Sequence, residues 1–272
     1  MAEDRALKSA KKRIMQILWG VIVGAAVLVL FLTAAANTSQ AAAQTMASLP
    51  GVGRLVRVVT FRSYRDQLAS GRGQARVDTL MVHGLEDTAL EEKINTALAN
   101  WSEEMIARYH SDLEEMGTAG GREAVDCRLG RVTMTDRFLS VQLCGTIAQG
   151  SAQELTRWYT ADLETGQLLE LKDLFADGAD YVDPISEEIR GQMQRQLAED
   201  PHAGWLLRSE KQPTGFWEIA PDQSFTLTED GRLVIAFDEG EAGIGALGAV
   251  EFEIPAEVTD PIRAQNSPLA AA

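Results

Sequence analysis

The sequence has 272 residues, of which 45% are hydrophobic and 24% charged, enough for a folded protein with a sizeable core. It carries 25 Lys+Arg against 40 Asp+Glu, a formal net charge of −15. A body this acidic repels nucleic acid and anionic lipid, so we expect no nucleic-acid partner. The charge either attracts a cationic protein or peptide or serves only to keep the chain soluble.

The N-terminal region predicts a membrane anchor. Residues 1–15 form a short basic tail, 16–36 are almost wholly apolar, and 37–47 read as a small, polar tether. The twenty uncharged residues 17–36, at about 1.5 Å each in a helix, span roughly the 30 Å hydrocarbon core. The preceding bases place the N-terminus in the cytoplasm and the bulk outside the cell membrane, as a single-pass protein. A cleaved signal peptide remains the alternative, because small residues follow at Ala41 and Ala43.

The next stretch predicts a strand and then a long helix. Val56 to Phe61 is rich in β-branched residues, and 65–75 reads as a loop. Residues 88–116 predict a helix that starts with a Thr88–Glu91 capping box and ends at Gly117. Its apolar residues recur every three or four positions and form one core-facing stripe: Leu90, Ile94, Leu98, Trp101, Met105, Tyr109 and Leu113.

A β-meander follows the helix, with strands at 124–133 and 137–147. A tight turn at Thr135 and Asp136 would place Cys127 directly opposite Cys144. Opposed Cβ atoms lie about 4.5–5.5 Å apart, close enough for a modest adjustment to bridge. The two cysteines in an exported domain therefore predict one disulfide.

The C-terminal part predicts one more helix and several short strands. A hairpin is centred on 164–166, a helix covers 184–199, and strands cover 224–227, 233–237 and 249–254, with a Gly-rich loop at 240–248. The chain thus reads as an α+β protein: one transmembrane helix, then an extracytoplasmic antiparallel sheet with packed helices. We divide the outer domain into an N-terminal part (48–150), a C-terminal part (151–262) and a tail (263–272).

The sequence offers no catalytic constellation. His83, His110 and His202 are scattered, and no metal-type spacing occurs, so we expect neither an enzyme nor a metal or cofactor. A G-x-G-x-x-G match at 243–248 precedes a strand rather than a helix, which argues against a dinucleotide site. The nearby acidic residues, 238–241, could serve a cation or simply form a solvated loop.

Four stretches together resemble the RsiV-type anti-sigma factors, whose outer domain is shared with some peptidoglycan deacetylases. They are 41–61 (AAAQTMASLPGVGRLVRVVTF), 91–113 (EEKINTALANWSEEMIARYHSDL), 158–189 with its Leu-x-Asp-Leu-Phe pattern, and 221–255 with the closing strands and Gly-rich loop. The resemblance covers about 36–260. It implies a membrane regulator whose outer domain binds an extracellular protein, lysozyme in the best-known members.

The resemblance also implies how the signal is passed on. Ligand binding would expose a juxtamembrane site, here near Ala41 and Ala43, to signal peptidase, and an intramembrane protease would then release an extracytoplasmic-function sigma factor. The 13–16 residues before the predicted span are fewer than the family's cytoplasmic segment. A binding module for wall glycan or peptide, without sigma-factor control, is the competing hypothesis.

We expect the ligand face to combine two loops, where the family's recognition loops fall. Ile244 and Ala246 occupy positions where lysozyme-binding members carry Pro and Tyr. The predicted ligand-binding residues are Asp238, Glu239, Glu241, Ile244, Ala246, Gly150 and Ser151.

Overall fold

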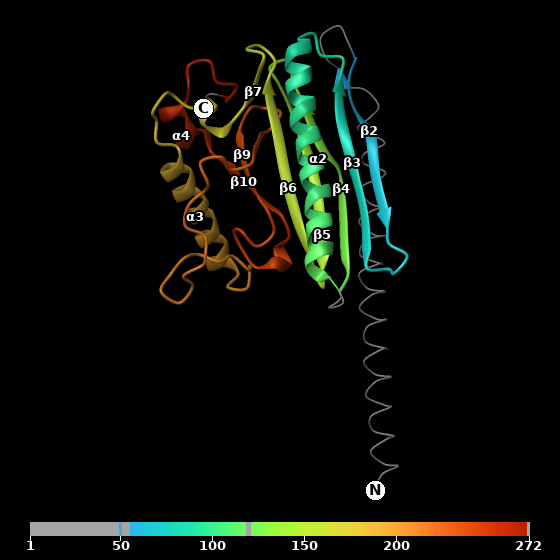
Figure 1. Ribbon diagram of the computed structural model, residues 1–272. Helices are drawn as coiled ribbons and strands as arrows, with labels where there is room; N and C mark the ends of the chain where they lie inside the picture. The colour runs from blue at the N-terminus through green and yellow to red at the C-terminus, as the bar shows by residue number, and fades with distance from the viewer. Residues whose placement is uncertain (1–48, 51–54, 118–120, 271–272) are drawn as a thin grey trace, which may run out of the picture. The chain divides into compact units, whose positions relative to one another are not determined.

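The computed structural model describes residues 49–50, 55–117 and 121–270 (Figure 1). All belong to the second of two compact units, Ser48–Ala272. Within the described ranges, no helix is both long and apolar enough to cross a membrane. The predicted tail, membrane span, tether and processing residues Ala41 and Ala43 lie outside these ranges.

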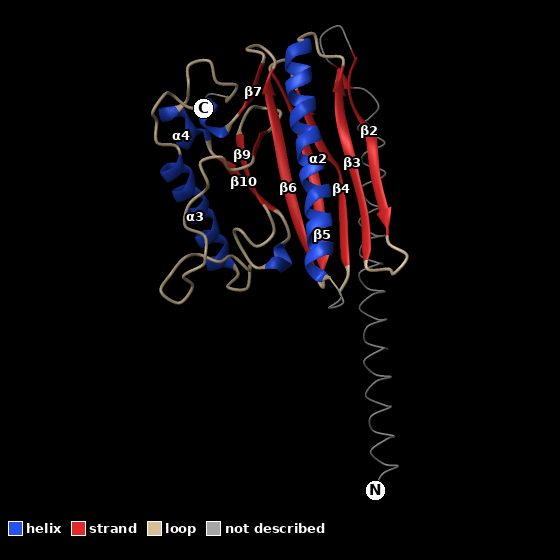
Figure 2. Ribbon diagram, viewed as in Figure 1, coloured by secondary structure: helices blue, strands red, loops and turns tan. Residues whose placement is uncertain are grey.

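A seven-stranded sheet with one long helix packed on it forms the first of two cores. The strands lie in chain order from β1 to β7, antiparallel except that β3 and β4 are parallel because helix α2 connects them. Figure 2 shows α2 lying along one face of this sheet. The elements are β1 (Leu49–Pro50), β2 (Leu55–Gln67), β3 (Gly73–His83), α2 (Thr88–Met116), β4 (Glu123–Met134), β5 (Phe138–Gln149), β6 (Ser151–Asp162) and β7 (Gln167–Leu169).

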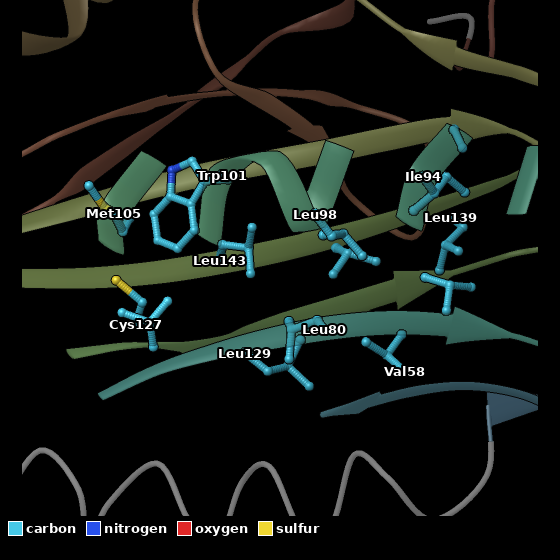
Figure 3. Packing of buried hydrophobic residues seen from close by; sticks show 14 of the residues in the cluster. Val58, Leu80, Ile94, Leu98, Trp101, Met105, Cys127, Leu129, Leu139 and Leu143 are labelled. Carbon is cyan, nitrogen blue, oxygen red and sulfur yellow. The ribbon is translucent and has the colours of Figure 1, made fainter. Parts of the chain in front are cut away.

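Helix α2 confirms the predicted range and stripe, and corrects the predicted cap. Its N-cap is Asp87, whose carboxylate accepts from the Ala89 and Leu90 N–H groups. Glu91 instead accepts from the Gly84 and Leu85 N–H groups, so it braces the preceding loop. The buried stripe packs on the inner residues of β3, β4 and β5, as Figure 3 shows for its labelled side chains. The predicted α+β class with a helix packed on a mainly antiparallel sheet is confirmed.

The β4–β5 hairpin corrects the predicted disulfide. Four residues separate the paired Met134 and Leu139, and a bulge follows between Leu129 and Val132, so the register differs from the one that a two-residue turn gives. Cys127 therefore pairs with Gly145, and Cys144 pairs with Arg128. A one-residue offset turns the two side chains to opposite faces of the sheet. Both cysteines are free, Cys127 buried under α2 and Cys144 half-buried on the other face.

A second core lies beyond β6 and β7, where α3 packs against a three-stranded sheet in the order β10-β9-β8. The elements of this second core are η1 (Leu171–Leu174), α3 (Val182–Glu199), β8 (Phe225–Leu227), β9 (Leu233–Phe237), η2 (Gly245–Leu247), β10 (Val250–Ile254), α4 (Ala256–Thr259) and η3 (Asp260–Ile262).

In the large sheet, the predicted loop at 65–75 is shorter than expected, since β2 runs to Gln67 and β3 begins at Gly73.

Candidate ligand-binding site

The site forms where the N-terminal half of β6 meets the loop between β9 and β10. Strand β7 pairs with β6 only at Thr160–Asp162, so the rest of that edge needs other partners. The Thr156 N–H donates to Asp238 Oδ1 at 2.6 Å. The Glu154 N–H donates to Glu239 Oε2 at 2.8 Å, and the Glu239 N–H returns a bond to the Glu154 carbonyl at 2.9 Å.

Two of the predicted ligand-binding acids therefore cap a strand edge. A buried backbone N–H without an acceptor is costly, and these carboxylates supply the acceptors that a neighbouring strand would otherwise give. Glu241 has a similar local task, because its Oε2 accepts from the Asp238 N–H at 2.9 Å. The sequence-based hypothesis treats these residues as a free acidic surface, whereas the structure gives each a bonding partner within the fold.

A small polar pocket opens beside these caps. Its volume is about 130 Å³. Burial raises the pKa of Asp238, the bond from the Thr156 N–H lowers it, and the nearby Glu241 charge raises it again. The pocket thus gathers carboxylates at a site that is only partly solvated. It is lined by Thr156, Arg157, Ala220, Asp222, Gln223, Ser224, Ala236, Asp238 and Glu241.

The Gly-rich loop (Gly240–Gly248) is held on a second segment of chain. The Ile244 N–H donates to the Gly204 carbonyl at 2.9 Å, and the Leu206 N–H donates to the Ala242 carbonyl. A side chain at Gly243 would lie 2.9 Å from the Gly204 carbonyl oxygen, so glycine permits this close approach. Ile244 and Ala246 project outward, with Ile244 43% exposed. The loop is therefore a braced platform that presents two apolar side chains to solvent.

The second predicted loop lies at the same end of β6. Gly150 forms the β5–β6 turn with φ of 88°, and both it and Ser151 are exposed. Glu154, three residues further along β6, accepts from the Ala249 N–H at 3.2 Å. This bond connects the start of β6 to the end of the Gly-rich loop.

Sequence reasoning missed a cluster that joins the two sheets. The Trp158 indole N–H donates to Glu251 Oε1 at 3.1 Å, and the Arg131 guanidinium lies 5.0 Å from the Trp158 ring centre and forms an ion pair with Glu251. These residues come from β4, β6 and β10, and no local pattern connects them. Asp222, in the pocket wall, was missed for the same reason. Among the described residues, no group of three or more His, Cys, Asp or Glu side chains is arranged to hold a metal ion.

Comparisons with known proteins place this architecture. The DUF3298 family, described as a protein of unknown function, matches residues 172–257, which hold most of the second core and the Gly-rich loop. A solved member of that family from Bacteroides fragilis NCTC 9343 superposes with a TM-score of 0.56 at 15% identity, covering 79% of this chain and 95% of its own. A second, from Pseudomonas aeruginosa PAO1, gives 0.53 at 12% identity, covering 84% and 100%. The fold is thus that of the DUF3298 proteins.

A more similar relative narrows the class. The anti-sigma-V factor RsiV of Bacillus subtilis (strain 168) is 32% identical over 258 residues, 94% of this chain and 87% of the relative. The chain belongs to the RsiV family of anti-sigma factors.

Proposed function

We propose that this chain is a single-pass membrane regulator that restrains a sigma factor until its outer domain binds an extracellular ligand. Membership in the RsiV family is the observation that carries the proposal, since the similarity extends over 94% of the chain, including the predicted anchor. The role is one of binding rather than catalysis. Localisation in the cell membrane, with the N-terminus in the cytoplasm, follows from the uncharged run at 17–36 and the bases before it.

The ligand in this proposal is a basic protein, with lysozyme as the first candidate. The net charge of −15 would steer a cationic partner towards the domain. Ile244 and Ala246 on the braced loop, with the turn at Gly150 and Ser151, would supply contacts, and the polar pocket offers carboxylates for a basic side chain. Binding would then lead to cleavage by signal peptidase near Ala41 and Ala43 and by an intramembrane protease.

The binding step can be tested without disturbing the edge caps. Ala246→Arg places a bulky cation on the platform, and Ala198→Arg makes the same change on an exposed position of α3. We expect Ala246→Arg to weaken lysozyme binding by about tenfold or more, as the loss of a central contact does, and Ala198→Arg to leave it unchanged. Equal binding by both variants would move the ligand site elsewhere. Retention on purified peptidoglycan without lysozyme binding would favour the wall-binding hypothesis.

The signalling step has its own test. A sigma-dependent reporter should respond to lysozyme in cells with the natural chain and stay silent when Ala41 and Ala43 are both replaced by Phe, because signal peptidase requires small residues at its cleavage site. A full response from the double variant would refute the processing site but leave the binding proposal intact.

A further inference from the structure

Among the strands that the structure describes, none pairs with the outer edge of β2 over most of its length. Among the described residues, only Leu49 and Pro50 pair with this edge, and they reach only Val56 and Leu55. From Arg57 to Gln67 the strand pairs with β3 on one side and with no described strand on the other. Alternate backbone N–H and C=O groups of this stretch therefore point outward, ready to pair with an added strand.

Exposed apolar side chains gather on and beside this edge. Phe61 is 66% exposed and Val59 is 36% exposed, both on β2, and Leu68 follows directly after the strand at 37%. They are three of the five large hydrophobic side chains that are exposed in the described part of the chain. Phe61 sits at a bulge, between Thr60 and Arg62, where the pairing with β3 shifts. Extended peptides that add a strand to a sheet bind at an edge of this kind, where unpaired backbone groups lie beside exposed apolar side chains.

The charge of this edge is opposite to that of the chain. Residues 55–83 contain five arginines and two aspartates, a net charge of +3, whereas the whole chain carries −15. Three of the arginines lie on β2 itself and are exposed: Arg57, Arg62 and Arg65.

A second copy of the chain fits this edge poorly. Antiparallel pairing of two β2 edges about Phe61 would set Arg57 opposite Arg65 on both sides of the centre. Like charges directly opposite destabilise a strand pair, whereas opposite charges stabilise it. The arginines and the bulge are devices that discourage self-pairing, and they leave a complementary strand as the favoured occupant.

We propose that the Arg57–Gln67 edge of β2 is a docking site for an extended acidic segment of another protein, which adds to the sheet as a strand. Its carboxylates would face the three arginines, and its apolar residues would cover Val59 and Phe61. This site lies on the opposite edge of the large sheet from β6 and β7, so it is independent of the ligand face proposed above.

The test uses the full chain in neutral detergent micelles and a ten-residue synthetic peptide of glutamate, valine and threonine in which each face of the extended strand carries both glutamate and valine. We expect saturable binding by fluorescence anisotropy. Hydrogen exchange should slow at those amides of 57–67 that point away from β3. The triple variant Arg57→Glu, Arg62→Glu, Arg65→Glu should bind about tenfold or more weakly, since three charge pairs are lost. The variant Arg208→Glu, an exposed arginine of the second core region, should bind like the natural chain.

A peptide N-methylated at every residue keeps its charge but has no N–H group to donate along either edge, and it tests the idea even if the triple variant misfolds. Loss of binding on methylation supports strand addition. Equal binding by the methylated peptide, slow exchange of these amides before any peptide is added, or displacement of the peptide by phosphatidylglycerol vesicles would overturn the proposal. Equal binding by the methylated peptide would mean that charge alone holds it. Slow exchange before the peptide is added would mean that the chain itself covers the edge, and displacement by vesicles would mean that the surface binds lipid.

Discussion

Glu123 should make the stability of the domain depend on pH. This residue opens β4 and is 1% exposed, and neither carboxyl oxygen has a hydrogen bond of good geometry among the described residues. Gln149 of β5 and Asp112 and Arg108 of α2 are its polar neighbours. Burial raises the pKa of Glu123 from 4.5 to about 7, against the lowering effect of Gln149 and with a further rise from the Asp112 charge.

The size and the sign of the effect on the free energy of unfolding follow from that pKa. A rise from 4.5 to about 7 corresponds to about 3 kcal/mol of unfolding free energy, as an upper value. Because the fold disfavours the charged form, the unfolded chain loses its proton first. This contribution to stability is therefore intact below pH 4.5, declines as the pH rises, and is fully lost above about pH 7. Glu123→Gln cannot ionise and should remove this decline.

Urea unfolding of residues 48–272 at pH 4.5, 6 and 8 measures the effect. The natural domain should lose up to about 3 kcal/mol more than Glu123→Gln between pH 4.5 and 8. Glu115→Gln changes an exposed glutamate on the neighbouring helix α2 and should follow the natural domain. If Glu123→Gln and the natural domain decline in parallel, the buried carboxyl is not the cause and the reasoning fails.

Three further changes test the core, the edge caps and the thiols. Trp101→Ala should cost about 3–5 kcal/mol in urea unfolding, because its ring fills the space between α2 and Gly145. Asp238→Ala should cost about 1–3 kcal/mol by leaving the Thr156 N–H without its acceptor, whereas Glu229→Ala, in an exposed turn, should cost less than about 0.5 kcal/mol. Cys127 and Cys144 should both react with an alkylating reagent only after denaturation, because burial raises the pKa of each thiol, that of Cys144 to about 11. If the native protein weighs two hydrogen atoms less than the reduced chain, the two cysteines form a disulfide and this prediction is wrong.

The sequence predicted those elements that are specified by local spacing. Helix α2 was placed at its observed ends because its apolar stripe repeats with the helical period over eight turns and a glycine follows directly. The same holds for β9 and β10, which are short runs of β-branched and aromatic residues separated by turn-forming residues. Only the capping residue of α2 was wrong, because both Asp87 and Thr88 are good caps and the choice depends on the preceding loop.

The sequence-based predictions that were wrong or missing concern features that depend on contacts between distant residues. A single bulge and a shifted hairpin turn were enough to turn two cysteines to opposite faces of the sheet, and neither leaves a distinct signal in the sequence. The parallel pairing of β3 with β4 was not predicted either, because a loop was predicted at 65–75 and no strand between it and helix α2.

The candidate ligand face shows why charge alone is a poor guide to recognition. Asp238 and Glu239 look like a free acidic surface in the sequence, yet each accepts a backbone hydrogen bond from β6. Neutralising either residue would loosen the strand edge on which the platform rests, and binding would fall whether or not a ligand touches the carboxylate. Ile244 and Ala246 carry no such structural bond through their side chains and are exposed. Changes at these two positions therefore separate recognition from stability, whereas changes at the acidic residues measure the sum of both.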